Sequence, residues 1–311
     1  MKPLLLKPIV DKTIWGGNRL GTIRNHPENI GTWWEVSAHS YGSNEITNLD
    51  EKTTLLEVIE KDPDGILGPG YTLHEMLRLA YLDSQEALSI QVHPDDNYAK
   101  KHAHDFGKFE TWYILDASDD ATLVAGVKID DAKEIEAALH NQDLEKYLQK
   151  WPVHKGDYFI IPDGLIHAMG KNILALEIGT NSNTTYRFYD YGRKDKNGNT
   201  RPLHLKESFD VADFSLQPTY LKACKKNRQL TDNQYFTVDE LWIDKDIFIT
   251  TDQCYCIITN IDKETCIIEW NDEVIEIDGY GSLFVPYNAQ EIRIVSNAHI
   301  LYSRPKKEKN R

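Results

Sequence analysis

Residues 88–96 read LSIQVHPDD, and this stretch alternates apolar and polar side chains as a β-strand does. Successive side chains on a strand point to opposite faces. The polar face is predicted to carry Ser89, Gln91 and His93, which are uncharged groups that coordinate metals or bind phosphate. The apolar face is predicted to consist of Leu88, Ile90 and Val92. The separation of these polar side chains from the apolar ones predicts a functional site on the polar face.

Two further stretches carry metal-binding side chains beside short apolar runs. Residues 107–113 read GKFETWY and contain Glu110, and residues 161–168 read IPDGLIHA and contain His167. Two imidazoles and a carboxylate commonly hold a divalent metal and leave one coordination position open for substrate. Together with His93, these residues predict a metal site. The competing interpretation is that each histidine only ends a strand or caps a loop.

Length and charge limit the classes of protein to which the chain can belong. It has 311 residues, of which 41% are hydrophobic and 27% charged, as expected for one large or two modest globular domains. The formal net charge of -14 argues against general affinity for nucleic acid or for an anionic membrane. A local cluster of Lys and Arg can still bind a small anionic substrate.

The cysteines and the apolar runs predict a location in the cell. None of the four cysteines belongs to a CxxC pair, which favours free thiols in a reducing compartment. The N-terminal stretch has only three consecutive leucines before a lysine, and no later run is long enough to span a bilayer. A cytoplasmic protein is therefore expected.

Periodicity predicts two helical parts in a chain that is otherwise rich in strands. Helices are predicted within residues 54–82, namely over 54–61 and over 72–82, and again within residues 129–150. Over 72–82 the apolar residues at helical spacing are Leu73, Met76, Leu77 and Ala80. Asp95 or Asp96 is predicted to cap a short helix after the first motif. Strand candidates dominate from residue 156 onward. In the last eighty residues they recur every eight to twelve residues, as in a sandwich or barrel.

These motifs occur in an order that resembles a known family. Besides the three stretches above, the chain contains Trp15-Gly16-Gly17 near its start and Asn183-Thr184-Thr185-Tyr186-Arg187 after them. In this respect it resembles the type I mannose-6-phosphate isomerases in their short bacterial form. The resemblance covers about the first two thirds of the chain, and the last third matches only in general β character.

The resemblance implies a mainly β fold of the cupin type, which is a double-sheet jelly roll. A catalytic cupin domain with a few helices is expected over residues 1–230. A second, smaller, cupin-like β-sandwich is expected over residues 231–311.

The resemblance also implies which residues form the site. It implies one zinc ion per chain, with ligands at Gln91, His93, Glu110 and His167. It further implies Arg187 as the catalytic arginine, and Ser89 and Lys108 as groups that help to hold substrate phosphate. The alternative for Gln91 is a hydrogen bond that orients a ligand without contacting the metal.

The implied activity is the interconversion of mannose 6-phosphate and fructose 6-phosphate through a cis-enediol. Arg187 is expected either to neutralise the enediolate or to grip the phosphate. Glu177 is the candidate base for the C2 proton, and its alternative is a surface salt bridge. Two other classes remain open, a cupin oxygenase with Fe(II) on two histidines and a carboxylate, and a non-catalytic cupin that binds sugar phosphates. The sequence leaves the oligomeric state open.

Overall fold

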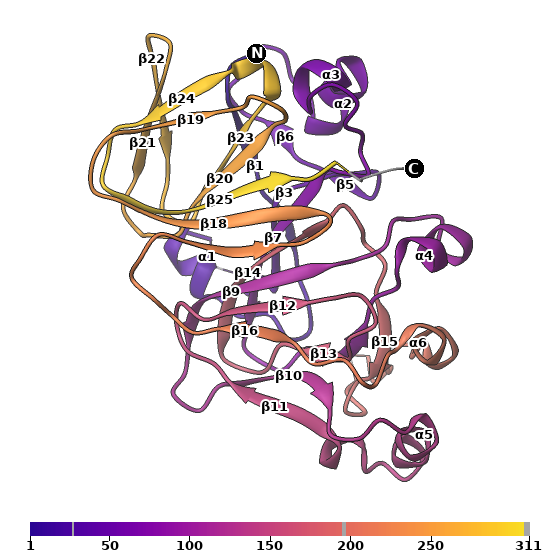
Figure 1. The fold of residues 1–311 in the computed structure, drawn as a ribbon. Helices are drawn as coiled ribbons and strands as arrows, with labels where there is room; N and C mark the ends of the chain where they lie inside the picture. The colour runs from indigo at the N-terminus through magenta and orange to yellow at the C-terminus, as the bar shows by residue number, and fades with distance from the viewer. Residues whose placement is uncertain (27, 195–196, 308–311) are drawn as a thin grey trace. The chain divides into compact units, whose positions relative to one another are not determined.

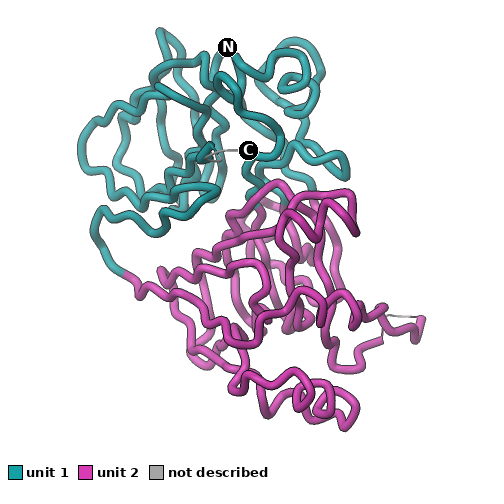
Figure 2. The backbone as a smooth tube through the Cα atoms, turned by 45° about the vertical axis from the view of Figure 1, so that its right-hand side comes forward, with its two compact units in different colours: residues 1–9, 34–79, 224–311 teal, residues 10–33, 80–223 magenta. Residues whose placement is uncertain are grey.

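The computed structural model describes residues 1–26, 28–194 and 197–307, and it is mainly β, as predicted. The chain forms two compact units (Figure 2). Unit 1 comprises residues 1–9, 34–79 and 224–311, and unit 2 comprises residues 10–33 and 80–223. All the motifs of the predicted site lie in unit 2.

Unit 2 contains a five-stranded antiparallel sheet in the order β11-β10-β13-β8-β15. Its strands are β8 (Ile90–Val92), β10 (Thr122–Val127), β11 (Leu148–Pro152), β13 (His167–Ala168) and β15 (Tyr186–Tyr189). The first motif of the sequence therefore forms a central strand, because β8 pairs with β13 on one side and β15 on the other.

A second sheet runs through unit 2 in the order β16-β12-β9-β14-β7 and continues into β3 and β2. Its strands are β2 (Ile9–Asp11), β3 (Thr32–Val36), β7 (Leu77–Ser84), β9 (Glu110–Ala117), β12 (Tyr158–Ile161), β14 (Ile173–Thr180) and β16 (Thr219–Leu221). Figure 1 shows β12, β9 and β14 side by side in this sheet.

Two apolar clusters show which way β8 faces. A buried cluster that includes Trp112 of β9 and Leu123 of β10 joins the two sheets of unit 2. Ile90 and Val92 belong to a different cluster, on the opposite face of the five-stranded sheet. The polar face of β8 is thus directed between the sheets, as the alternation predicts. Leu88 departs from the prediction, because it precedes β8 and packs in the cluster between the sheets.

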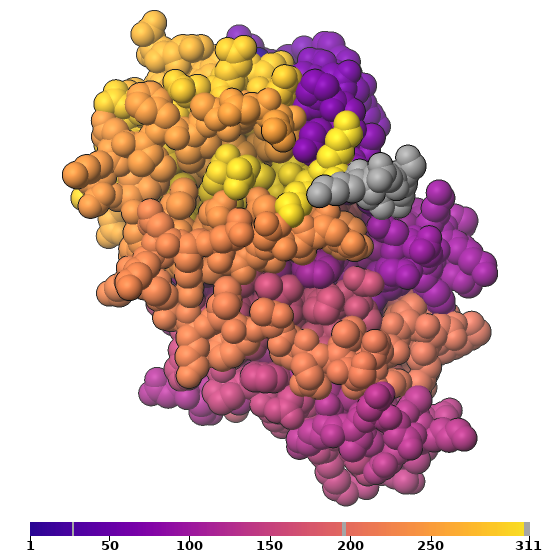
Figure 3. Space-filling model, viewed as in Figure 1, coloured from indigo at the N-terminus to yellow at the C-terminus, as the bar shows by residue number. Residues whose placement is uncertain are grey.

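Short helices complete unit 2. They are α1 (Arg19–Ile23), α4 (Asp96–His102), α5 (Ala132–His140), the 3-10 turn η1 (Leu144–Lys146) and α6 (Leu205–Val211). The predicted cap is confirmed, since the Asp95 side chain accepts a hydrogen bond from the Tyr98 amide at 2.7 Å. In the helical part predicted over residues 129–150 the helix ends at His140, and the last residues begin β11. Figure 3 shows α5, in magenta, at the surface.

The helical prediction for residues 72–82 is wrong. These residues lead into β7, in which all eight residues from Leu77 to Ser84 are buried. A strand that is buried on both faces has apolar residues on both faces, so its sequence loses the alternation of a half-exposed strand. The spacing of Leu73, Met76, Leu77 and Ala80 then mimics a helix. The neighbouring prediction at residues 54–61 is confirmed by α2 (Leu55–Lys61), which begins with a capping box at Thr54.

Unit 1 is built from two main sheets. The first has the order β17-β18-β25-β20-β23-β1-β6 and the second β19-β24-β21-β22. Their strands are β1 (Leu4–Lys7), β6 (Glu45–Ile46), β17 (Arg228–Asp232), β18 (Phe236–Ile243), β19 (Ile247–Thr250), β20 (Cys256–Asn260), β21 (Cys266–Trp270), β22 (Glu273–Ile277), β23 (Ser282–Val285), β24 (Glu291–Ile294) and β25 (Ala298–Pro305). Buried residues of both sheets, such as Ile258 and Ile268, share one core. The remaining elements are β4 (Ala38–His39), β5 (Gly42–Ser43), α3 (Pro63–Ile66) and the 3-10 turn η2 (Tyr287–Ala289).

The two units do not follow the boundaries predicted from the sequence. The sequence places a division at residue 230, whereas the unit that contains the C-terminal strands also includes residues 1–9 and 34–79. The reason is long-range pairing, because Leu4 of β1 pairs with Phe284 of β23. Pairing across most of the chain leaves no local sequence signal. Among the described residues, no helix is long and apolar enough to cross a membrane.

Replacing the cap of α4 should destabilise unit 2. Asp95→Ala removes the acceptor for the Tyr98 amide, and we expect a loss of about 1 kcal/mol in the free energy of unfolding. Urea unfolding in the presence of a chelator measures this loss without a contribution from metal binding. The control is Asp119→Ala at an exposed turn, which should change stability by less than about 0.5 kcal/mol. Equal stability of the two variants would refute the role of the cap.

Candidate metal centre and active site

Three predicted ligands converge between the two sheets of unit 2. His93 directly follows β8, Glu110 begins β9 and His167 begins β13. All three side chains are fully buried. One ligand atom from each lies within 4.8 Å of the others, which is the spacing that a single metal ion requires. The sequence prediction that these three residues come together is therefore confirmed.

The Glu110 carboxylate lies between the two imidazoles. Its Oε2 is 3.3 Å from His93 Nε2, and its Oε1 is 3.3 Å from His167 Nε2. The two rings are tilted by 47° with their centroids 4.7 Å apart. Both imidazoles therefore direct the same nitrogen, Nε2, toward the carboxylate.

The outer nitrogens of both rings are bound to backbone carbonyls. His93 Nδ1 donates to the carbonyl of Thr184 at 3.0 Å, and His167 Nδ1 donates to the carbonyl of Leu165 at 2.8 Å. Since a carbonyl oxygen only accepts, each Nδ1 carries the proton and each Nε2 presents a lone pair. This tautomer is the one that a histidine needs to bind a metal through Nε2.

The local electrostatics keep the ligands in the protonation states that metal binding requires. Burial, with a further contribution from the Lys108 ammonium, lowers the pKa of His93 to about 3, so its ring is neutral at physiological pH. Burial alone would raise the pKa of Glu110. The Lys108 ammonium outweighs that effect and holds this pKa well below its usual range.

The unsatisfied polar atoms of the cluster fit a bound cation. Among the described residues, His93 Nε2 and Glu110 Oε1 are buried without a hydrogen bond, and Glu110 Oε2 has the Lys108 ammonium beside it. Such atoms cost free energy unless a partner compensates them. Two neutral imidazoles and one carboxylate match the donor set of catalytic zinc sites. The residues present therefore fit a divalent metal ion of the zinc type.

Gln91 and Arg187 lie beside the cluster on the same sheet. Gln91 pairs with His167 on one neighbouring strand and with Arg187 on the other, so the three residues form a row across the sheet. Side chains of directly paired residues lie on one face. The Gln91 amide nitrogen is 3.2 Å from His167 Nε2. This contact places Gln91 next to the metal-binding nitrogen.

Lys108 and Glu177 approach the cluster from the other sheet. Lys108 Nζ lies 2.5 Å from Glu110 Oε2 and 3.0 Å from Glu177 Oε1, and both carboxylates and the ammonium are buried. Glu177 of β14 pairs with Trp112, two residues beyond Glu110 along β9. The surface salt bridge considered for Glu177 is therefore excluded, and the carboxylate belongs to the same buried group of charges.

Arg187 is held from two directions at the edge of the cluster. Its Nη1 donates to the carbonyl of Pro202 at 2.8 Å, and its backbone amide donates to His204 Nδ1 at 3.0 Å. Its Nε is buried and makes no hydrogen bond among the described residues. The guanidinium therefore keeps a donor free for an anionic group. Ser89, the other predicted phosphate contact, is buried directly before β8.

Several residues around the site carry no signal in the sequence. The carbonyls of Thr184 and Leu165 orient the imidazoles, but every residue has a carbonyl. Trp112 packs edge-on against the His167 ring, with centroids 5.5 Å apart. Gly179 lies opposite Glu110, where an added Cβ would meet the Phe109 carbonyl oxygen at 2.8 Å. The last two are visible in the sequence only as an apolar residue and a glycine within strands.

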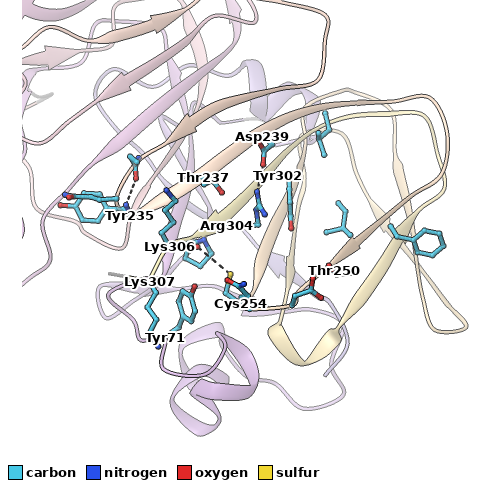
Figure 4. A pocket seen from close by; sticks show the side chains of 18 of the residues that line it. Tyr71, Tyr235, Thr237, Asp239, Thr250, Cys254, Tyr302, Arg304, Lys306 and Lys307 are labelled. Carbon is cyan, nitrogen blue, oxygen red and sulfur yellow. Dashed lines mark hydrogen bonds and ion pairs between the residues drawn. The ribbon is translucent and has the colours of Figure 1, made fainter. Parts of the chain in front are cut away.

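A cavity of about 1550 Å³ lies in unit 1 (Figure 4), and none of these residues is in its wall. Its wall includes Tyr71, Arg304 and Lys306. The Arg304 guanidinium is paired with Asp239, and the Lys306 ammonium is paired with Asp232. The cavity contains no group like the buried cluster of unit 2, so its size does not make it the site of the chemistry.

Comparison with known proteins identifies relatives with a common activity. The chain is 37% identical over 213 residues to the mannose-6-phosphate isomerase of Streptococcus mutans, covering 68% of this chain and 67% of the relative. It is 30% identical over 313 residues to the mannose-6-phosphate isomerase ManA of Bacillus subtilis, covering 97% of this chain and 98% of the relative. No family model matches the chain.

Solved structures give the same result for the fold. The crystal structure of the mannose 6-phosphate isomerase from Bacillus subtilis matches with a TM-score of 0.89 at 28% identity, covering 98% of this chain and all of the other. A mannose 6-phosphate isomerase bound with zinc and yttrium matches with a TM-score of 0.76 at 14% identity, which concerns the fold alone. From these relatives and from the buried cluster, the chain belongs to the type I mannose-6-phosphate isomerases, which are aldose–ketose isomerases.

Proposed function

We propose that this isomerase binds one zinc ion per chain through His93, Glu110 and His167, with Gln91 as a fourth ligand. The observation that carries the proposal is the convergence of three fully buried ligand atoms within 4.8 Å. The neutral Nε2 atoms and the ionised Glu110 supply the donors that zinc prefers.

The proposed substrate is a sugar phosphate, mannose 6-phosphate, which is converted to fructose 6-phosphate through a cis-enediol. A bound zinc ion would polarise the oxygens on C1 and C2 of the sugar. The chain's own residues must then move a proton between these carbons and hold the charge that develops. Oxygenase chemistry on the same ligand set is disfavoured by the family to which the chain belongs. A cytoplasmic location stays a prediction.

Glu177 is the proposed base for the C2 proton. Its buried carboxylate lies within the same cluster, 3.0 Å from Lys108 Nζ. The ammonium lies beside the carboxylate, where it can stabilise charge as the proton moves. Lys108, which lies between two carboxylates, is better placed to stabilise charge and to contact the substrate phosphate than to act as the base. Ser89 is the second proposed phosphate contact.

Arg187 is proposed to stabilise the enediolate. It pairs directly with Gln91, so its side chain starts one strand away from a proposed metal ligand. A permanently charged guanidinium beside the reacting carbons favours the transition state over the neutral ground state. The structure thus favours this role over a grip on the phosphate.

The histidine ligands should be required for zinc binding. His93→Ala and His167→Ala each remove one of the proposed ligands, so we expect loss of the metal and of turnover together. Metal analysis of the purified variants, with a mannose 6-phosphate assay alongside, measures both. His140→Ala, at the exposed end of α5, is the control and should keep both zinc and activity. Full zinc occupancy in either ligand variant would remove that residue from the site.

The role of Arg187 predicts which kinetic constant falls. Arg187→Ala should retain zinc and lose most of its kcat, because an interaction made only with the transition state is removed. Arg187→Lys keeps the positive charge but lacks the two-pronged hydrogen-bonding geometry of the guanidinium, so it should recover only part of kcat. Steady-state kinetics with zinc content measured alongside test this. The control is Arg24→Ala, whose guanidinium stacks on Trp33 and Tyr81. A loss confined to KM would assign Arg187 to the phosphate instead.

The role of Glu177 predicts a defect in proton transfer. Glu177→Gln keeps the shape of the side chain but cannot take a proton, so kcat should fall by about 10²- to 10⁴-fold while zinc stays bound. The measurement is the exchange of the C2 hydrogen of mannose 6-phosphate with deuterated solvent. Exchange should fall in parallel with kcat. Exchange at the wild-type rate would show that another group is the base.

A further inference from the structure

The loop between β14 and β15 is hydrogen-bonded to the segment that leads into β9. The Thr180 amide donates to the Phe109 carbonyl at 3.0 Å, and Ser182 Oγ donates to the Phe106 carbonyl at 2.7 Å. Both acceptors lie just before Glu110, the carboxylate ligand of the proposed zinc site. The position of the loop and the position of this ligand are therefore linked through direct hydrogen bonds.

The Asp105 carboxylate binds the end of this loop that leads into β15. Asp105 Oδ2 accepts hydrogen bonds from the Asn183 amide at 2.9 Å and from Thr184 Oγ1 at 2.8 Å. Its other oxygen, Oδ1, accepts from the Phe106 amide at 2.8 Å. Hydrogen bonds to an ionised carboxylate are stronger than neutral ones. The loop is thus held at residues 183 and 184 by a charged anchor on the opposite segment.

The anchored residue is the one that orients His93. The carbonyl of Thr184 accepts the Nδ1 proton of His93 at 3.0 Å, which fixes the tautomer and turns Nε2 toward Glu110. The His93 backbone is itself fixed, since its carbonyl accepts from the Gly164 amide at 2.9 Å. Rotation of the ring is then the remaining freedom, and the Thr184 carbonyl limits that rotation.

We propose that Asp105 is a positioning residue for the metal site, which acts on His93 through Thr184. The inference rests on the proposed zinc site and adds a residue that does not contact the metal. Asp105 accepts a hydrogen bond from the Thr184 hydroxyl and so fixes the position of this residue. The Thr184 carbonyl accepts the proton of His93 Nδ1, and His93 Nε2 is therefore oriented before the ion binds. Groups that orient metal ligands typically contribute 10- to 100-fold to metal affinity or activity.

The central experiment compares zinc affinity in Asp105→Asn and in the wild type by competition with a chromophoric chelator. Asparagine keeps the shape of the side chain but replaces one accepting oxygen with a donor, so one set of hydrogen bonds to Asp105 is lost. We expect zinc to bind about 10- to 100-fold more weakly. If the wild type binds no zinc, the proposed function fails, and this inference fails with it. If the wild type binds zinc and Asp105→Asn binds it equally well, only this inference is overturned.

The matched control is Asp157→Asn in the same unit. Asp157 also collects three donors, namely the His154 amide, the Tyr220 hydroxyl and the Ala223 amide, at 2.9 to 3.0 Å. It lies just before β12, whose opposite end pairs with Glu110. This variant should lose stability without losing zinc affinity. Equal weakening of zinc binding in the two variants would show a general effect of destabilisation and would overturn the proposal.

A spectroscopic readout separates positioning from stability. In metal-free wild-type protein labelled with ¹⁵N-histidine, the Nδ1 proton of His93 should exchange slowly with water because it is bound to a buried carbonyl. Asp105→Asn should speed that exchange. Thr184→Val removes a single hydroxyl bond to Asp105 and keeps the carbonyl, so it should give a smaller effect in the same direction even if Asp105→Asn fails to fold. Wild-type exchange and zinc affinity in Thr184→Val would overturn the proposal.

Discussion

The site of this isomerase depends on a carboxylate that is placed where water cannot reach it. Glu110 is fully buried, and an isolated ionised carboxylate in such a place is strongly disfavoured. Its charge is stabilised by the Lys108 ammonium, and the rings of His93 and His167 lie against it. Each of these groups must in turn be held in place, His93 and His167 by backbone carbonyls and Lys108 by Glu177. The double sheet of unit 2 brings these groups together, because the two imidazoles belong to one sheet and Glu110 and Glu177 to the other, while loops supply the two carbonyls.

The chemistry of the site could be predicted from the sequence because it follows local rules. Alternation along residues 88–96 places Gln91 and His93 on one face, and β8 has this arrangement. The strands expected at intervals of eight to twelve residues in the last eighty residues occur as β19 to β24, since turn residues separate the apolar runs. The roles of the individual site residues stay predictions. Those of Ser89, Gln91, Lys108 and Arg187 are implied by the resemblance to a family, and that of Glu177 by its place in an apolar run.

Some features depend on residues far apart in the sequence or on backbone carbonyls, which every residue has. These features could not be predicted. The pairing of β1 with β23 gives the N-terminus to unit 1, and no residue near Leu4 signals it. The strand β7 is buried on both faces and therefore lacks a period of two. The hydrogen bond between Asp105 and Thr184 is a third example. Asp105 is one polar loop residue among many, and its role follows only from the contact of the Thr184 carbonyl with His93. Local sequence patterns thus identify the side chains of the site, whereas the tertiary structure determines their orientation.

The balance of charge explains how an acidic protein can bind an anionic substrate. The chain carries a formal charge of -14, and the charged side chains of the buried cluster are one ammonium and two carboxylates. A divalent cation on these ligands would change the sign of the cluster from negative to positive, and the Arg187 guanidinium would add a further positive charge at its edge. Surface carboxylates are screened by salt over about 10 Å, whereas buried charges are screened much less. A sugar phosphate would therefore experience the local positive field rather than the net charge. Metal binding would thus create both the electrophile and the electrostatic attraction for the substrate.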